Sequence, residues 1–267
     1  MPEMLQLGLD DAAPRGNPGY QLDVGAVISQ TFSVTVSNLP SFVLVGLLAY
    51  SPALVLHVIA ALAASSNFTY PLVLIANLSK SLLALVLTGA LTFGVMRQLR
   101  GEKASIGETV QAGLESLGRV FLVSLLVGLL TLGGFLLCIV PGVIVLCMNW
   151  VAVPVAVIER PGIRASLSRS QELTAGTRMA VFAVVLVIGM VTGVAAMVTT
   201  VGLTAAAAAL TGTKDLNGVD FAVTQLVQTL VLLPFECLQA TSAAVGYHDL
   251  RVHREGADVA DLVRVFE

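Results

Sequence analysis

The sequence predicts an all-α integral membrane protein with six transmembrane helices and three interfacial amphipathic helices. Two properties of the whole chain lead to this fold class. Of its 267 residues, 56% are apolar and only 12% are charged, whereas about 25% of the residues in a soluble domain are charged. The mean hydropathy is +0.90. These values exclude a water-soluble globule, and the net charge of −3 gives no reason to expect binding to nucleic acid.

Six apolar stretches are long enough to cross about 30 Å of hydrocarbon as helices. They are residues 40–64, 71–96, 119–140, 142–158, 179–203 and 221–247. Only Pro141 and Gly142 separate the third stretch from the fourth, which predicts a tight hairpin. The fourth stretch is the shortest and contains Pro154, so it either crosses with little tilt or is a partly buried segment. Ala90–Gly94 and Gly189–Gly193 are pairs of small residues that let helices approach closely.

The basic residues lie almost entirely on one side of the predicted spans, which is typical of cytoplasmic segments. Twelve of the 14 lysines and arginines belong to the N-terminal tail, the connections after the second and fourth stretches, or the C-terminal segment. The connections on the other side contain only Lys214. We therefore expect both termini in the cytoplasm.

Three further segments on the basic side have helical patterning but are not apolar enough to span. They are residues 23–37, 105–118 and 162–176. In the second, Ile106, Val110 and Leu114 recur on one helical face, with Glu108 and Glu115 opposite. The pattern predicts helices that lie in the headgroup plane with the apolar side down. The alternative is an ordinary loop helix that packs on the bundle from the cytoplasm.

These segments indicate a pseudo-threefold repeat of an amphipathic helix followed by a membrane hairpin. Residues 23–48 and 105–130 align without a gap, and both contain the run LVGLL. The predicted organisation is a flexible tail, one membrane domain with three repeats, and a cytoplasmic tail. Their bounds are 1–20 for the first tail, 21–252 for the domain, about 21–100, 104–160 and 162–252 for the repeats, and 253–267 for the second tail.

The first twenty residues lack the basic and apolar regions of a signal peptide, so we expect no cleaved leader.

Three blocks of the chain are similar to a known bacterial family of integral membrane proteins. They are Leu137–Glu159, Ala165–Arg178 and Tyr247–Gly256, and the most specific positions are Ser170, Glu172, Leu173, Thr174 and Gly176. The family is named for the membrane domain found at the head of some glycerophosphoryl diester phosphodiesterases. His248 departs from its pattern, where a second tyrosine is commoner. The resemblance covers about residues 21–262 and implies a six-helix domain in the bacterial inner membrane, without the phosphodiesterase activity.

No catalytic, metal-binding or cofactor motif is visible, so we expect no cofactor and no metal. The sequence contains no HExxH, GxSxG or Walker loop, and its histidines, His57, His248 and His253, are scattered. The three cysteines all lie in apolar runs, which is typical of small hydrophobic residues rather than of disulfides. They are Cys138, Cys147 and Cys237.

The most unusual residue is Glu236, near the middle of the sixth stretch and two positions after Pro234. A carboxylate at that depth costs several kcal/mol, so it is expected to face the bundle. It either serves an ion, proton or lipid headgroup, or is a neutral packing residue. The same stretch contains Gln225, Gln228 and Gln239, and we predict an intramembrane polar site from these four residues together with Lys80 and His57. For Lys80, snorkelling to the outer surface is favoured over pairing with Glu236.

A second candidate site is the basic surface on the cytoplasmic side. Arginines at headgroup depth attract anionic lipid phosphate, and the alternative is that they only set the topology. The residues in question are Arg160, Arg164, Arg169, Arg178, Arg251 and Arg254.

The sequence therefore favours a membrane module that binds lipid or a protein partner and organises the membrane. The alternative is a transporter or channel subunit with Glu236 in an intramembrane polar site. An intramembrane enzyme would need Glu236 to converge with His57 or Lys80. The expected partners are membrane lipids, anionic ones among them, and a second membrane protein or another copy of the chain.

Overall fold

The computed structural model describes residues 22–63, 68–102, 104–211 and 218–255, and these residues form helices and no strand. Six segments are long and apolar enough to cross a membrane, which confirms an all-α protein of the multi-pass type. The helices, in chain order, are α1 (Val24–Ser37), α2 (Leu39–Leu62), α3 (Thr69–Leu99), α4 (Ile106–Leu137), α5 (Ile139–Met148), α6 (Ala152–Ile158), α7 (Ile163–Thr174), α8 (Arg178–Thr211) and α9 (Gly218–Glu255).

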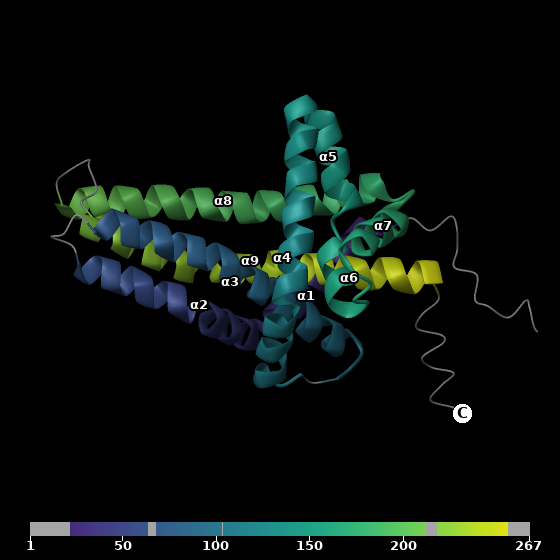
Figure 1. Cartoon of the computed structure of the whole chain (residues 1–267), viewed down its shortest axis with the longest axis horizontal. Coiled ribbons are helices and arrows are strands. Elements are labelled where there is room, and N and C mark those ends of the chain that lie inside the picture. Colours follow the sequence, from purple (N-terminus) through teal and green to yellow (C-terminus); the bar gives the residue numbers. More distant parts are fainter. Residues whose placement is uncertain (1–21, 64–67, 103, 212–217, 256–267) are drawn as a thin grey trace, which may run out of the picture.

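Of the five long helices that the structure describes, four lie alongside one another and α4 does not (Figure 1). Helices α2, α3, α8 and α9 form a bundle, whereas α4 and α5 run crosswise to it. We call the end where α2 and α8 finish the far end of the bundle. The opposite end, where Arg97, Arg178 and Arg254 lie, is the basic end.

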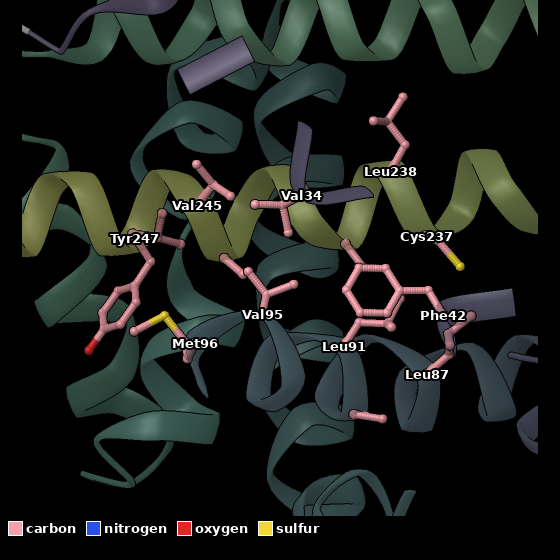
Figure 2. Packing of buried hydrophobic residues seen from close by; sticks show 14 of the residues in the cluster. Val34, Phe42, Leu87, Leu91, Val95, Met96, Cys237, Leu238, Val245 and Tyr247 are labelled. Carbon is pink, nitrogen blue, oxygen red and sulfur yellow. The ribbon is translucent and has the colours of Figure 1, made fainter. Parts of the chain in front are cut away.

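The main core lies within this bundle, toward the basic end. Figure 2 shows Val34 of α1, Phe42 of α2 and Leu91 of α3 gathered around α9, which contributes Val245 and Tyr247. All five side chains are buried. Because lipid tails are as apolar as leucine, close packing rather than escape from water favours these contacts in a membrane.

Local sequence signals explain where several helices begin and end. Asp23 accepts a hydrogen bond from the Ala26 amide at 3.0 Å and caps α1. A proline in the first turn of α2 needs no amide partner there. Ser105 and Glu108 form a capping box at the start of α4. After α7, Gly176 adopts a φ of +79°, a backbone conformation that glycine reaches without strain.

The prediction of a separate interfacial helix over residues 105–118 is wrong. These residues are the first part of α4, which continues without a break to Leu137. No proline interrupts the segment, and its change from polar to apolar side chains alters the surroundings of the helix without ending it. Residues 23–37 and 162–176 do contain separate helices, α1 and α7. The second predicted repeat therefore differs from the other two, and the threefold repeat stays a prediction.

The fourth apolar stretch is not one helix. A turn at Asn149–Val151 divides it into α5 and α6. In α6 the side chains of Ala152, Val155 and Ala156 are at most 2% exposed, so this part of the stretch is a buried segment, one of the two outcomes expected from the sequence.

Candidate functional site

The two helices that supply Glu236 and Tyr50 to the predicted polar site each continue through an internal proline, which removes one backbone hydrogen bond. Glu236 lies near the middle of α9, two residues after Pro234, which leaves the Leu230 carbonyl without its helical donor. In α2, Pro52 does the same to the Leu48 carbonyl. That carbonyl accepts a hydrogen bond of 2.8 Å from the Ser51 hydroxyl. Both prolines thus provide polar backbone within otherwise apolar helices.

Glu236 binds two partners from two other helices. Lys80 of α3 lies with its Nζ 3.0 Å from the Glu236 Oε1, and the Tyr50 hydroxyl of α2 donates a hydrogen bond to Oε2. The Lys80 Nζ also lies 5.6 Å from the centre of the Tyr50 ring, a cation–π geometry. The expectation that Lys80 snorkels to the outer surface is therefore wrong, because a carboxylate is within reach across the bundle.

This ion pair borders a cavity of about 640 Å³, which we call the central cavity. The volume is in the range of about 300–1,000 Å³ that is usual for small-molecule sites. The side chains of Lys80 and Glu236 remain 21% and 30% exposed, whereas Tyr50 is 1% exposed. Besides these three, the lining contains Asn77, Ser81, Ala84, Leu87, Thr88, Trp150, Val153, Gln239, Ala240 and Ala243.

Two mostly apolar grooves adjoin the central cavity. The first, about 510 Å³, lies between α3 and α4 and shares Ser81 with the cavity. The second, about 520 Å³, lies between the arms of the α4–α5 hairpin and shares Trp150 and Val153. The two grooves share Ser124 with each other. A polar cavity at mid-helix thus continues into two surfaces suited to hydrocarbon.

The structure brings only part of the predicted polar stripe to this site. Gln239 lines the central cavity with Glu236 and Lys80. Gln228 instead donates a hydrogen bond of 2.8 Å to the Thr200 hydroxyl of α8, and Gln225 is not among the lining residues. His57 is fully buried in α2, with its Nδ1 2.8 Å from the Ala53 carbonyl. It therefore does not converge with Glu236.

The six arginines of the predicted headgroup surface divide into two groups. Arg169 is paired with Glu159 at 3.3 Å, Arg251 contacts the Tyr247 hydroxyl at 3.4 Å, and Arg254 donates to the Glu172 carbonyl at 2.7 Å. The Arg169 pair joins α7 to the end of α6, and the Arg254 bond joins α7 to α9, whereas the Arg251 contact lies within α9. The other three have exposed side chains: Arg160, Arg164 and Arg178.

The sequence blocks that carry the family resemblance form hydrogen bonds between α5, α6, α7 and α9 at their points of contact. Ser170 and Thr174 donate hydrogen bonds to the Met148 carbonyl at the end of α5, at 2.9 and 3.3 Å. Tyr247 donates to the Glu159 Oε1 at 2.8 Å. Each of these roles is structural, because each bond joins two helices and none reaches the central cavity.

Sequence reasoning missed Tyr50 and Trp150 as members of the site. Tyr50 is one of four tyrosines in the chain, and a hydroxyl in the middle of a predicted span was the signal that could have found it. Trp150 is the only tryptophan. It packs on α9 at Gly246, where a β-carbon would collide with the indole ring.

The side chains that line the site, among them a lysine, a carboxylate, a tyrosine and two amides, suit charged and hydrogen-bonding ligands. In the described ranges, no group of three or more histidine, cysteine, aspartate or glutamate side chains could hold a metal ion. Comparisons with family models, with curated proteins and with solved structures find no match for this chain. Membership of the phosphodiesterase membrane-domain family therefore stays a prediction.

Proposed function

We propose that this protein is a lipid-binding membrane module of the bacterial inner membrane, with both termini in the cytoplasm. Its ligand is a phospholipid whose phosphate contacts Lys80 in the central cavity and whose acyl chains follow the two adjoining grooves. The observation that carries this proposal is the partly exposed ion pair between Lys80 and Glu236 at mid-helix.

The exposed polar atoms of the ion pair favour a polar ligand in the central cavity. A charged or hydrogen-bonding side chain that faces hydrocarbon has no partner for its polar atoms, and this costs several kcal/mol. Lys80 and Glu236 neutralise each other, but both keep exposed surface, and Asn77 and Gln239 line the same space. An occupant that supplies hydrogen-bond acceptors and charge removes this cost.

A phospholipid fits the cavity together with its surroundings. It reaches an intramembrane cavity from the bilayer itself, and its acyl chains match the apolar walls formed by residues such as Leu82, Leu125 and Leu132. Its phosphate is a ligand for the Lys80 ammonium, and a lysine ammonium binds phosphate as a compact charge. At the basic end, Arg160, Arg164 and Arg178 are exposed and favour anionic lipids around the protein.

The test is the affinity for phospholipid of the purified chain and of three variants. Phosphatidylethanolamine and phosphatidylglycerol are each titrated into delipidated protein, and the complexes are measured by native mass spectrometry. Lys80→Met should raise the apparent Kd about tenfold, because a charge-assisted hydrogen bond contributes about 1.5–3 kcal/mol. Glu236→Gln should lower the Kd for phosphatidylglycerol, because it removes a carboxylate that repels the phosphate and competes for the Lys80 ammonium. The matched control is Gln228→Leu, which removes a polar side chain of α9 that contacts α8 rather than the cavity.

Lipid affinities that are equal in all four proteins would remove the proposal. The transporter alternative makes a different prediction, because its ligand is an ion rather than a lipid. If proteoliposomes show an ion flux that Glu236→Gln abolishes while the lipid Kd stays unchanged, the central cavity is a transport site instead.

A further inference from the structure

We propose that the α4–α5 hairpin inserts into the membrane leaflet at the basic end and returns to that side without crossing the bilayer. The hairpin consists of Val123–Leu137 of α4, the turn at Cys138, and α5. Its partner is the acyl-chain layer of one leaflet. This inference does not require lipid binding in the central cavity, because it rests on the direction and the exposed tip of the hairpin, although one groove of the proposed lipid site lies between the two arms.

The first observation is the direction of the hairpin. In Figure 1, α2, α3, α8 and α9 lie along one common direction, and α4 and α5 run crosswise to it. A flat bilayer has a single normal, and four helices of 24 to 38 residues define it. Helices that lie across these four cannot also pass from one face of the membrane to the other.

The second observation is the length of the returning arm. Helix α5 has 10 residues, so it is about 15 Å long, whereas a span needs about 20 residues to cross 30 Å. The chain then turns at Asn149–Val151, and α6 packs against α4 and α7. The turn prevents α5 and α6 from acting as one continuous span.

The third observation is the chemistry of the tip. Leu136, Leu137, Ile139 and Val140 are 64–83% exposed, and Cys138 between them is also exposed. A connection that emerges into water usually contains polar residues. The tip has none, so its surroundings are hydrocarbon rather than water.

The leaflet follows from the two ends of the hairpin. Helix α4 begins beside the basic end, where Arg97 is paired with Glu102 and Glu108, each at 2.9 Å. After the hairpin, the chain returns to the exposed Arg160 and Arg164. Because both ends of the segment are on the basic side, the hairpin occupies the leaflet on that side. The positions of the basic residues relative to the membrane are the same as in a six-span topology.

The native thiol of Cys138 tests this arrangement directly, since Cys147 and Cys237 are buried. Intact cells are treated with a membrane-impermeant maleimide, and Cys138→Ala provides the background. The positive control is Phe68→Cys in the Cys138→Ala chain, because Phe68 is 70% exposed at the far end of the bundle. Phe68→Cys should be labelled from outside, and Cys138 should stay unlabelled.

A second measurement places the thiol in lipid. Cys138 is labelled in detergent with an environment-sensitive fluorophore, and the protein is reconstituted into vesicles that contain nitroxide-labelled phosphatidylcholine. The lipid nitroxide should reduce the emission of Cys138 at least twofold more than that of the Phe68→Cys control. External labelling of Cys138 at the level of Phe68→Cys would show that the hairpin crosses. Reaction only from the cytoplasm without nitroxide quenching would show that it lies in water. Either result overturns the proposal.

Discussion

The four-helix bundle and the crosswise hairpin are both apolar, but their side chains are used differently. The bundle contains the described intramembrane ion pair, its tyrosine partner and the buried histidine. The hairpin tip exposes Leu136, Leu137 and Ile139 by 72–83%. In the bundle, side chains from different helices pair with Glu236, whereas the tip of the hairpin exposes large apolar side chains.

This difference shows that hydropathy does not report the direction of a helix. The most apolar window of α4 has a mean hydropathy of 2.5, above the 1.8 of α3. Yet α3 belongs to the bundle and α4 runs crosswise to it (Figure 1). The lower value of α3 reflects Lys80, Asn77 and Ser81, which line the central cavity. Polar residues in an apolar helix indicate that it contacts other helices. Their absence indicates that the helix contacts lipid, but it does not show whether the helix lies along the membrane normal or across it.

The largest effect that we expect is the loss of stability when the charge of Lys80 is removed from the bundle. Lys80→Met leaves the Glu236 carboxylate with only Tyr50 as its described partner and should destabilise the fold by about 2–3 kcal/mol. This is less than for a fully buried pair, because both side chains are partly exposed. The double variant Lys80→Met/Glu236→Leu removes both charges and should regain most of the loss.

The matched change in the hairpin is Leu129→Ala. Leu129 is 58% exposed, so its truncation should alter stability by less than about 0.5 kcal/mol. All variants are compared by unfolding in mixed micelles with increasing fractions of a denaturing detergent. Equal losses for Lys80→Met and Leu129→Ala would contradict the distinction between the two regions.

The second prediction concerns the point at which α4 crosses α3. A β-carbon at Gly113 would lie 2.5 Å from the Val86 carbonyl oxygen and 2.8 Å from the Ala90 β-carbon. Gly113→Ala therefore forces the two helices apart and should cost about 1–3 kcal/mol. Gly118 lies on the same helix, and a β-carbon there would have no neighbour within 4 Å. Gly118→Ala should be neutral or stabilise by up to about 1 kcal/mol.

The measurement is again detergent unfolding, with the accessibility of Cys138 in the same samples as a report on the hairpin. A Gly113→Ala protein as stable as Gly118→Ala would show that the two helices are not in close contact in the membrane.

The apolar stretches could be predicted from the sequence, whereas the contacts between them could not. Helix rise and hydrocarbon thickness set the length of a span, and the predicted stretch 40–64 corresponds to α2 within a few residues. Tyr50 and Glu236, in contrast, are 186 positions apart. No periodicity within one helix shows which other helix lies beside it, and for this reason the pairing of Lys80 was predicted wrongly.

The two pairs of small residues show the same limit. Ala90–Gly94 faces α4, where Gly94 is close to Thr109 and Ala90 is close to Gly113. Gly189 and Gly193 of α8 have open space around them within the described chain. The two pairs have the same spacing, and only the first is at a described helix contact. Spacing therefore indicates that a close approach is permitted, and the rest of the fold decides whether it occurs.

The smallest effect that we expect concerns the start of the helix that leads into the hairpin. The Ser105 hydroxyl accepts a hydrogen bond from the Glu108 amide at 3.2 Å, and the Glu108 carboxylate accepts one from the Ser105 amide at 3.1 Å. Ser105→Ala removes the first bond and should destabilise the protein by about 1 kcal/mol, whereas Ser105→Asn keeps a capping oxygen and should cost much less. The loss should appear in detergent unfolding without any change in lipid affinity, since the cap lies at the basic end and not in the central cavity. If Ser105→Ala also raises the lipid Kd, the start of α4 is coupled to the cavity, and the hairpin and the bundle do not act as separate regions.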